Sequence, residues 1–128
     1  MGMLLIGALG QAYVLALVVT IIIEGSVYVI FKKMGIVCPG VLFLVVLAVV
    51  ANTATNPLMN FFHMRYGVSL VLLEACVVLG EGFIIWMAYR IGGVKAPCYE
   101  PFFLSFSANM ISLVIGVPVL GYVMESVI

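Results

Sequence analysis

Charge is the scarcest feature of this sequence. Lysine, arginine, aspartate and glutamate together make up only 8% of its 128 residues, whereas 66% are hydrophobic. Soluble domains contain about 45–50% apolar and about 25% charged residues. So few charges cannot cover this much apolar surface in water, and the mean hydropathy of +1.39 agrees. These shortages exclude a water-soluble fold and predict an integral membrane protein embedded in a lipid bilayer.

Basic residues do not exceed acidic ones either. Five of each give a formal net charge of zero. Proteins that bind nucleic acids need a surplus of lysine and arginine, gathered on one face, to contact phosphates. The charge balance therefore excludes a nucleic-acid partner.

Histidine and cysteine are scarce as well. His63 is the only histidine, and Cys38, Cys76 and Cys98 are the only cysteines. Zinc sites need such residues at ligand spacing, and a Ser–His–acid triad needs a suitably placed histidine. We expect incidental thiols rather than a metal or redox centre. A metal, a cofactor and a bond between Cys38 and Cys98 all stay unknown at this stage.

Long apolar runs are abundant instead. A helix needs about 20 apolar residues to cross the hydrocarbon core of a bilayer. Four segments qualify: Leu4–Phe31, Val41–Phe62, Val68–Tyr89 and Phe102–Met124. They lack the alternation of polar and apolar residues that marks the strands of a closed barrel. The expected fold is an all-α membrane protein, with four transmembrane helices in a single domain over residues 1–128.

The basic residues are distributed unevenly among the connections. Four of the five follow the first and third spans: Lys32, Lys33, Arg90 and Lys95. The second connection carries only Arg65. The positive-inside rule therefore predicts a multi-pass protein of the plasma membrane with loops 32–40 and 90–101 in the cytoplasm and both termini outside.

The sequence resembles itself after a shift of 57 residues. The matching uncommon residues are Glu24–Gly25 with Glu81–Gly82, Lys33 with Arg90, Gly35 with Gly92, Val37 with Val94, and Ala51–Asn52 with Ala108–Asn109. All of them fall in one register without a gap. This pattern predicts two tandem hairpins, over about residues 8–62 and 65–124, related by an axis along the membrane normal as in some transporters. An old duplication kept for packing alone is the alternative.

Polar residues recur at helical spacing within each span. The four stripes are Thr20, Glu24 and Tyr28; Asn52, Asn56 and Asn60, with Thr53 beside them; Glu74 and Glu81; and Ser105, Asn109 and Ser112. Residues at such spacing share one face of a helix, so we expect these faces to turn inward. Helical rise then predicts two tiers by depth. The central tier is Glu24, Glu81, Asn52 and Asn109, and the outer tier is Glu74, Asn56 and Thr53.

Three carboxyl groups inside the spans need an explanation. An acidic residue in the middle of a span costs about 2.5–3.5 kcal/mol, and no basic residue lies at matching depth to neutralise Glu24, Glu74 or Glu81. Protonation is one solution, because burial and mutual repulsion favour the neutral acid. A bound cation and a water-filled cavity are the others. The alternative is that neutral Glu and Asn side chains only hydrogen-bond the helices together, which fits one acid better than three.

Pro57 interrupts the second polar stripe. Its ring removes a backbone donor and frees the carbonyl of Thr53. Carbonyl, amide and carboxylate oxygens are hard ligands that suit Na⁺, Ca²⁺, Mg²⁺ or a polar solute. An ordinary proline kink is the alternative, and Pro118 in the fourth span does not align with Pro57 under the shift.

Together these features predict a small transporter that binds and translocates a cation or a small polar solute, with or without coupling to protons. The central tier would form the site, and the outer tier would form a second site or a gate. Two alternatives stay open. One is a non-catalytic accessory subunit of a larger membrane complex, and the other is an intramembrane enzyme in which two glutamates share a proton. Because four helices enclose little volume, we expect a homo-oligomer or a partner membrane subunit.

Overall fold

The chain folds into four helices in a computed structural model that describes residues 2–127. They are α1 (Gly2–Lys33), α2 (Val41–Tyr66), α3 (Leu70–Ile91) and α4 (Glu100–Val127). Each contains a segment that is long and apolar enough to span a membrane. The prediction of an all-helical chain with four candidate spans is confirmed. The bounds differ by a few residues, since α2 continues to Tyr66 and α4 already begins at Glu100.

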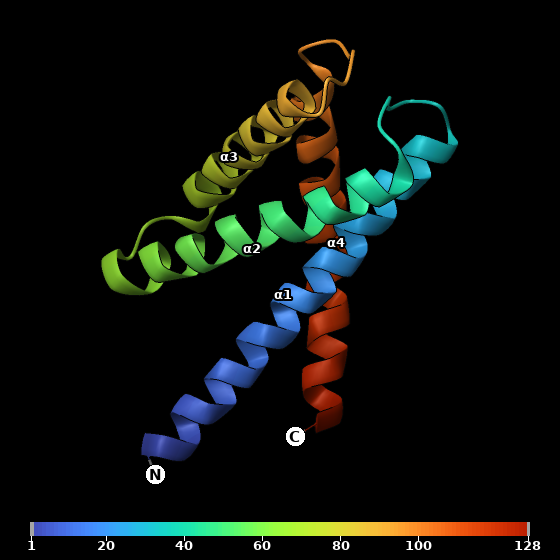
Figure 1. Cartoon of the computed structure of the whole chain (residues 1–128). Helices are drawn as coiled ribbons and strands as arrows, with labels where there is room; N and C mark the ends of the chain where they lie inside the picture. Colours follow the sequence, from blue (N-terminus) through green and yellow to red (C-terminus); the bar gives the residue numbers. More distant parts are fainter. Residues whose placement is uncertain (1, 128) are drawn as a thin grey trace.

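The helices form a ring in which each one packs on two others. Contacts join α1 to α2, α2 to α3, α3 to α4 and α4 back to α1. Figure 1 shows the α1–α2 and α3–α4 connections at one end of the molecule and both termini at the other. We call these the loop end and the termini end. The helices lie close together toward the loop end and spread apart toward the termini end.

Helices α1 and α3 end in the same backbone motif. In both, a glycine with positive φ follows the helix, Gly35 (+74°) or Gly93 (+66°). Its backbone N–H bonds to the carbonyl three residues earlier, and the next N–H bonds to the carbonyl five residues earlier. This is the Schellman motif, which needs a residue that tolerates the left-handed conformation. These glycines are 58 residues apart. The 57-residue shift pairs Gly35 with Gly92, but in the structure Gly35 corresponds to Gly93. The two hairpins are therefore out of register by one residue at these helix ends.

The apolar core fills the loop-end half of the ring. Its largest fully buried side chains include Tyr28, Leu44, Ile85 and Leu104, one from each helix. Elsewhere the surface is apolar, with residues such as Val71 more than half exposed. Such a surface suits hydrocarbon rather than water. The core thus closes the bundle at its loop end.

Glu100 fastens the loop end together. Its buried Oε1 accepts hydrogen bonds from the Cys38 backbone N–H at 3.0 Å and from the Tyr89 hydroxyl at 3.1 Å. One carboxylate at the start of α4 therefore holds the first connection and the end of α3. A carboxylate at a helix N-terminus also interacts favourably with the helix dipole.

Candidate functional site

A buried hydrogen bond joins α1 to α2. Asn52 Nδ2 donates to Glu24 Oε2 at 2.7 Å and to the backbone oxygen of Ala48, one turn earlier, at 3.0 Å. Both N–H groups of the amide are therefore used. Glu24 and Asn52 are each 0% exposed. The bond fixes the Glu24 carboxylate in the middle of the first hairpin.

The same arrangement joins α3 to α4. Asn109 Nδ2 donates to Glu81 Oε2 at 2.7 Å and to the backbone oxygen of Ser105, one turn earlier, at 2.9 Å. Every partner lies 57 residues after its counterpart in the first hairpin. The two hairpins are thus braced by the same kind of bond at corresponding positions.

The two glutamates differ at their second oxygen. Glu81 Oε1 is 2.7 Å from the hydroxyl of Thr55, so both of its oxygens have partners. Glu24 Oε1 is buried and has no hydrogen-bond partner among the described residues. An unpartnered buried acceptor costs about 1–3 kcal/mol, so it calls for a ligand or a proton. Of these two glutamates, Glu24 is the one with a spare acceptor; among the described residues the buried hydroxyls of Tyr13 and Tyr28 lack partners as well.

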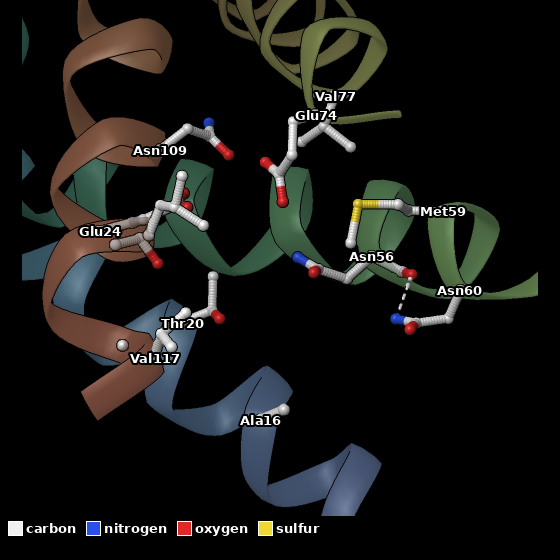
Figure 2. Close-up of a pocket in the computed structure, with 13 residues that line it drawn as sticks. Ala16, Thr20, Glu24, Asn56, Met59, Asn60, Glu74, Val77, Asn109 and Val117 are labelled. Atoms are coloured by element: carbon white, nitrogen blue, oxygen red, sulfur yellow. Dashed lines mark hydrogen bonds between the residues drawn. The ribbon is translucent and has the colours of Figure 1, made fainter. Parts of the chain in front are cut away.

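A polar cavity lies next to Glu24. Its volume is about 190 Å³, and all four helices line it. The polar side chains that line it are Thr20, Glu24, Asn56, Asn60, Glu74, Asn109 and Ser112. Figure 2 shows Glu74, Asn109 and Asn56 pointing toward the same hollow from three helices. The predicted inward turn of the polar stripes is thus present in the half of the bundle where the helices spread.

The cavity has an inner and an outer end. Glu24 and Asn109 lie at its inner end, next to the closed core, whereas Ala16, Asn60 and Val117 lie nearer the termini end. The cavity is partly open, and the packed loop-end core blocks it on the inner side. The outer end of the cavity therefore lies on the side where the helices spread (Figure 1), and its inner end lies against the packed core.

A chain of amides runs along the α2 wall of the cavity. Asn56 Nδ2 donates to Asn52 Oδ1 at 2.9 Å, and Asn60 Nδ2 donates to the Asn56 backbone oxygen at 3.0 Å. Asn52 in turn donates to Glu24. Hydrogen bonds therefore connect Glu24 through Asn52 to Asn56, which also lines the cavity.

The residues proposed from the sequence fall into three groups. Four of them line the cavity: Glu24, Asn56, Glu74 and Asn109. Asn52 and Glu81 lie behind it and hold lining residues in place. Thr53 belongs to neither group, because it is exposed and its hydroxyl donates to the Val49 backbone oxygen of its own helix. The structure does not bring Thr53 to the cluster.

Thr55, which the sequence analysis did not single out, contacts the buried Glu81 instead. Its hydroxyl contacts both Glu81 Oε1 and the Ala51 backbone oxygen. Sequence reasoning missed it because it lies outside the every-fourth-residue stripe of Asn52 and Asn56. Its spacing of three from Asn52 was a usable signal, since residues three apart also share a helix face.

The electrostatics of the cavity favour a cation. Among the described residues, two carboxyl groups line it, Glu24 and Glu74, and no lysine, arginine or histidine does. Within residues 2–127 no three His, Cys, Asp or Glu side chains gather at metal-binding spacing. The carboxylate and amide oxygens that line the cavity are hard ligands of the kind that cations prefer.

The proposed proton-sharing pair of glutamates is not assembled in this arrangement. A catalytic dyad of this kind needs two carboxyl groups in direct contact. In the described part of the chain, Glu24 and Glu81 hydrogen-bond to separate asparagines and make no hydrogen bond to each other.

Comparison of the chain with known protein families, with curated proteins and with solved structures finds no match. The function must therefore be inferred from the cavity, its charges and the packing around it.

Proposed function

We propose that this protein is a small membrane transporter that binds a cation or a small polar solute in the cavity and moves it across the bilayer. The observation that carries the proposal is the free Oε1 of Glu24, fully buried beside a cavity without a basic residue. A bound cation would supply the missing partner. A proton would supply it in the empty state, which couples the two.

The packing supports translocation as well as binding. A cavity that is blocked at the loop end and accessible from the termini end has the form of one state of an alternating-access cycle. Each hairpin is braced internally, by Glu24 with Asn52 or by Glu81 with Asn109. In the proposed cycle the two hairpins rock against each other as units, and the cavity becomes accessible from the loop end.

We also propose that the two hairpins are tandem repeats, over about residues 8–62 and 65–124. The support is the shared register of rare residues, the matching Glu–Asn hydrogen bonds and the matching ends of α1 and α3. In this view duplication produced two equivalent acids. Glu24 then kept a free oxygen for the ligand, while Glu81 was completed by Thr55 and became structural.

In the proposed orientation the loop end is cytoplasmic and the cavity faces outward in the plasma membrane. The support is the position of the basic residues: Lys32, Lys33, Arg90 and Lys95 all lie in or beside the loop-end connections. The small volume of the cavity supports a homo-oligomer or a partner membrane subunit as the working assembly.

The test is uptake into liposomes that contain the purified protein, with Na⁺, K⁺, Ca²⁺ and methylammonium as solutes, with and without a pH gradient. Glu24→Gln is expected to abolish the uptake that the wild type shows. Glu81→Gln is the matched control, because Glu81 is equally buried but lies outside the cavity, and it is expected to retain uptake. The proposal is wrong if the wild type moves none of these solutes or if Glu24→Gln transports normally.

A further inference from the structure

An apolar groove adjoins the polar cavity on the outer side of α3 and α4. Its volume is about 470 Å³. The residues that line it are Val71, Glu74, Ala75, Val78, Leu79, Phe106, Met110 and Leu113. Glu74 and Leu113 also line the polar cavity. The groove and the cavity therefore share a wall, and Glu74 is the one charged side chain that lines the groove.

The groove has the polarity of a lipid leaflet. Glu74 lies four residues after the start of α3, about 6 Å below the termini end of that helix. Leu79 lies deeper along α3, and on the antiparallel α4 Phe106 lies deeper than Leu113. A molecule with its polar head at Glu74 would thus extend its chain toward the middle of the bilayer, as a lipid of that leaflet does.

The charges specify the head group. Neither the groove nor the cavity is lined by a lysine, arginine or histidine. A phosphate head would find no counter-ion there and would be repelled by Glu74, whereas an ammonium group would be attracted. The unpartnered and fully buried Glu24 Oε1 beside the same cavity is a second acceptor for such a group.

We infer that the cavity and the groove together take a single-chain amphipathic amine, with its ammonium group in the cavity and its hydrocarbon chain in the α3–α4 groove. This inference rests on the proposed function, since it names the substrate class of the same cavity. Lipid chains are as apolar as the groove, so moving the hydrocarbon chain from lipid into the groove adds little binding energy. The groove instead sets the path and the orientation of the ligand. Glu74 lies at the boundary between the groove and the cavity, where the ammonium group would pass from the lipid leaflet into the cavity.

The test is photolabelling in proteoliposomes of zwitterionic phospholipid. The probe is a long-chain alkylamine with a diazirine in mid-chain, and the matched probe is the alcohol with the same chain. Mass spectrometry locates the labelled residues. The amine is expected to label residues 71–79 and 106–113 selectively, whereas the alcohol labels lipid-facing positions without this preference.

Substitutions separate the groove from the rest of the surface. Ala75→Trp fills the groove and is expected to remove the selective labelling by the amine. Ala54→Trp, at an equally exposed alanine on α2 that lines no described part of the groove, is expected to keep it. Both sites are exposed, so both variants are expected to fold.

Three outcomes would overturn the inference. They are equal labelling patterns for amine and alcohol, selective labelling that survives Ala75→Trp, and equal labelling of the groove by a diazirine phosphatidylcholine. If any of these occurs while methylammonium uptake still depends on Glu24, the proposed function stands and the amphipathic substrate is wrong. If methylammonium and the metal cations are not moved at all, the proposed function itself has failed.

Discussion

Glu24 and Glu81 are each followed by a glycine and each accept from an asparagine, but their surroundings at the second oxygen differ. Thr55 completes Glu81, while Glu24 Oε1 has no partner among the described residues. Glu81 also accepts from the Ser105 hydroxyl at 3.5 Å, so within the described chain its carboxylate has three hydrogen-bond partners and that of Glu24 has one. A buried carboxylate is costly when it is incompletely paired. At the scale of the residue, this assigns stability to Glu81 and ligand binding to Glu24.

The assignment predicts how the stability of Glu81 variants will differ. In Glu81→Gln the amide oxygen still accepts from Asn109 and the amide nitrogen donates to Thr55, so we expect little change. Glu81→Ala removes the carboxylate that both partners contact and leaves one N–H of the Asn109 amide without this acceptor, so it is expected to lower the free energy of unfolding by about 1–3 kcal/mol. Equilibrium unfolding in detergent, followed by circular dichroism, measures both. Equal destabilisation by Gln and Ala would contradict the structural role.

Cys38 gives a prediction about pH at the loop end. The pKa of its thiol is raised, first because nearby protein displaces water and then because of the Glu100 carboxylate. A raised pKa leaves less of the reactive thiolate at neutral pH. Glu100→Gln removes the negative charge, so Cys38 is expected to react faster with a maleimide at neutral pH, and the difference should vanish at a pH well above the pKa.

Tyr89→Phe is the control for this experiment. It removes a hydrogen bond to Glu100 but keeps the carboxylate charge, so it is expected to leave the Cys38 rate nearly unchanged. Equal rates in the wild type and Glu100→Gln at neutral pH would show that Glu100 does not act on the thiol.

At the scale of the element, the contact between α3 and α4 depends on a glycine. A Cβ added at Gly82 would lie 2.5 Å from Cδ1 of Phe102, too close without movement of the ring. A Cβ added at Gly80, on the same helix, would lie 3.9 Å from Thr55 Cγ2, an ordinary contact. Helix α3 therefore requires glycine at position 82, whereas position 80 has room for a larger residue.

The two glycines predict opposite effects of the same substitution. Gly82→Ala is expected to lower the free energy of unfolding by about 1–3 kcal/mol, because it overpacks the contact with Phe102. Gly80→Ala is expected to raise it by up to about 1 kcal/mol, because alanine favours the helix. Thermal unfolding of the two variants in one detergent makes the comparison. A stabilised Gly82→Ala variant would contradict the close approach of α4.

Much at this scale followed from the sequence, because span length and hydropathy are local properties. The predictions failed where contacts between residues far apart in the sequence determine the structure. The charge of Glu100 indicated a loop before Phe102, yet long-range hydrogen bonds from Cys38 and Tyr89 bury it in the first turn of α4. Thr53 was predicted and Thr55 was not, because helical spacing shows which residues share a face but not which edge of that face a neighbouring helix covers.

At the scale of the whole molecule, the bundle is closed at one end and spread at the other (Figure 1). The polar stripes predicted a shared interior, and four of the seven proposed site residues do line one cavity. The end at which the cavity opens depends on how the helices cross, which composition and spacing do not encode. The identity of the ligand was beyond the sequence for the same reason.

The proposed orientation predicts which connections are accessible from each side of the membrane. On intact cells, a membrane-impermeant maleimide is expected to label a cysteine introduced by Ser69→Cys, in the connection between α2 and α3. Native Cys98, in the α3–α4 connection, is expected to react only after the cells are opened. Both positions are exposed, so access across the membrane is the variable. The reverse pattern would place the cavity on the cytoplasmic side.

The central claim is that the free oxygen of Glu24 binds a cation, and calorimetric titration of the purified protein tests it most directly. Na⁺, K⁺, Ca²⁺ and methylammonium are titrated into the wild type, Glu24→Gln and Glu81→Gln in the same detergent. The account predicts that at least one cation binds to the wild type and to Glu81→Gln, and that this binding is lost in Glu24→Gln. Binding that is unchanged in Glu24→Gln, or lost only in Glu81→Gln, would contradict it.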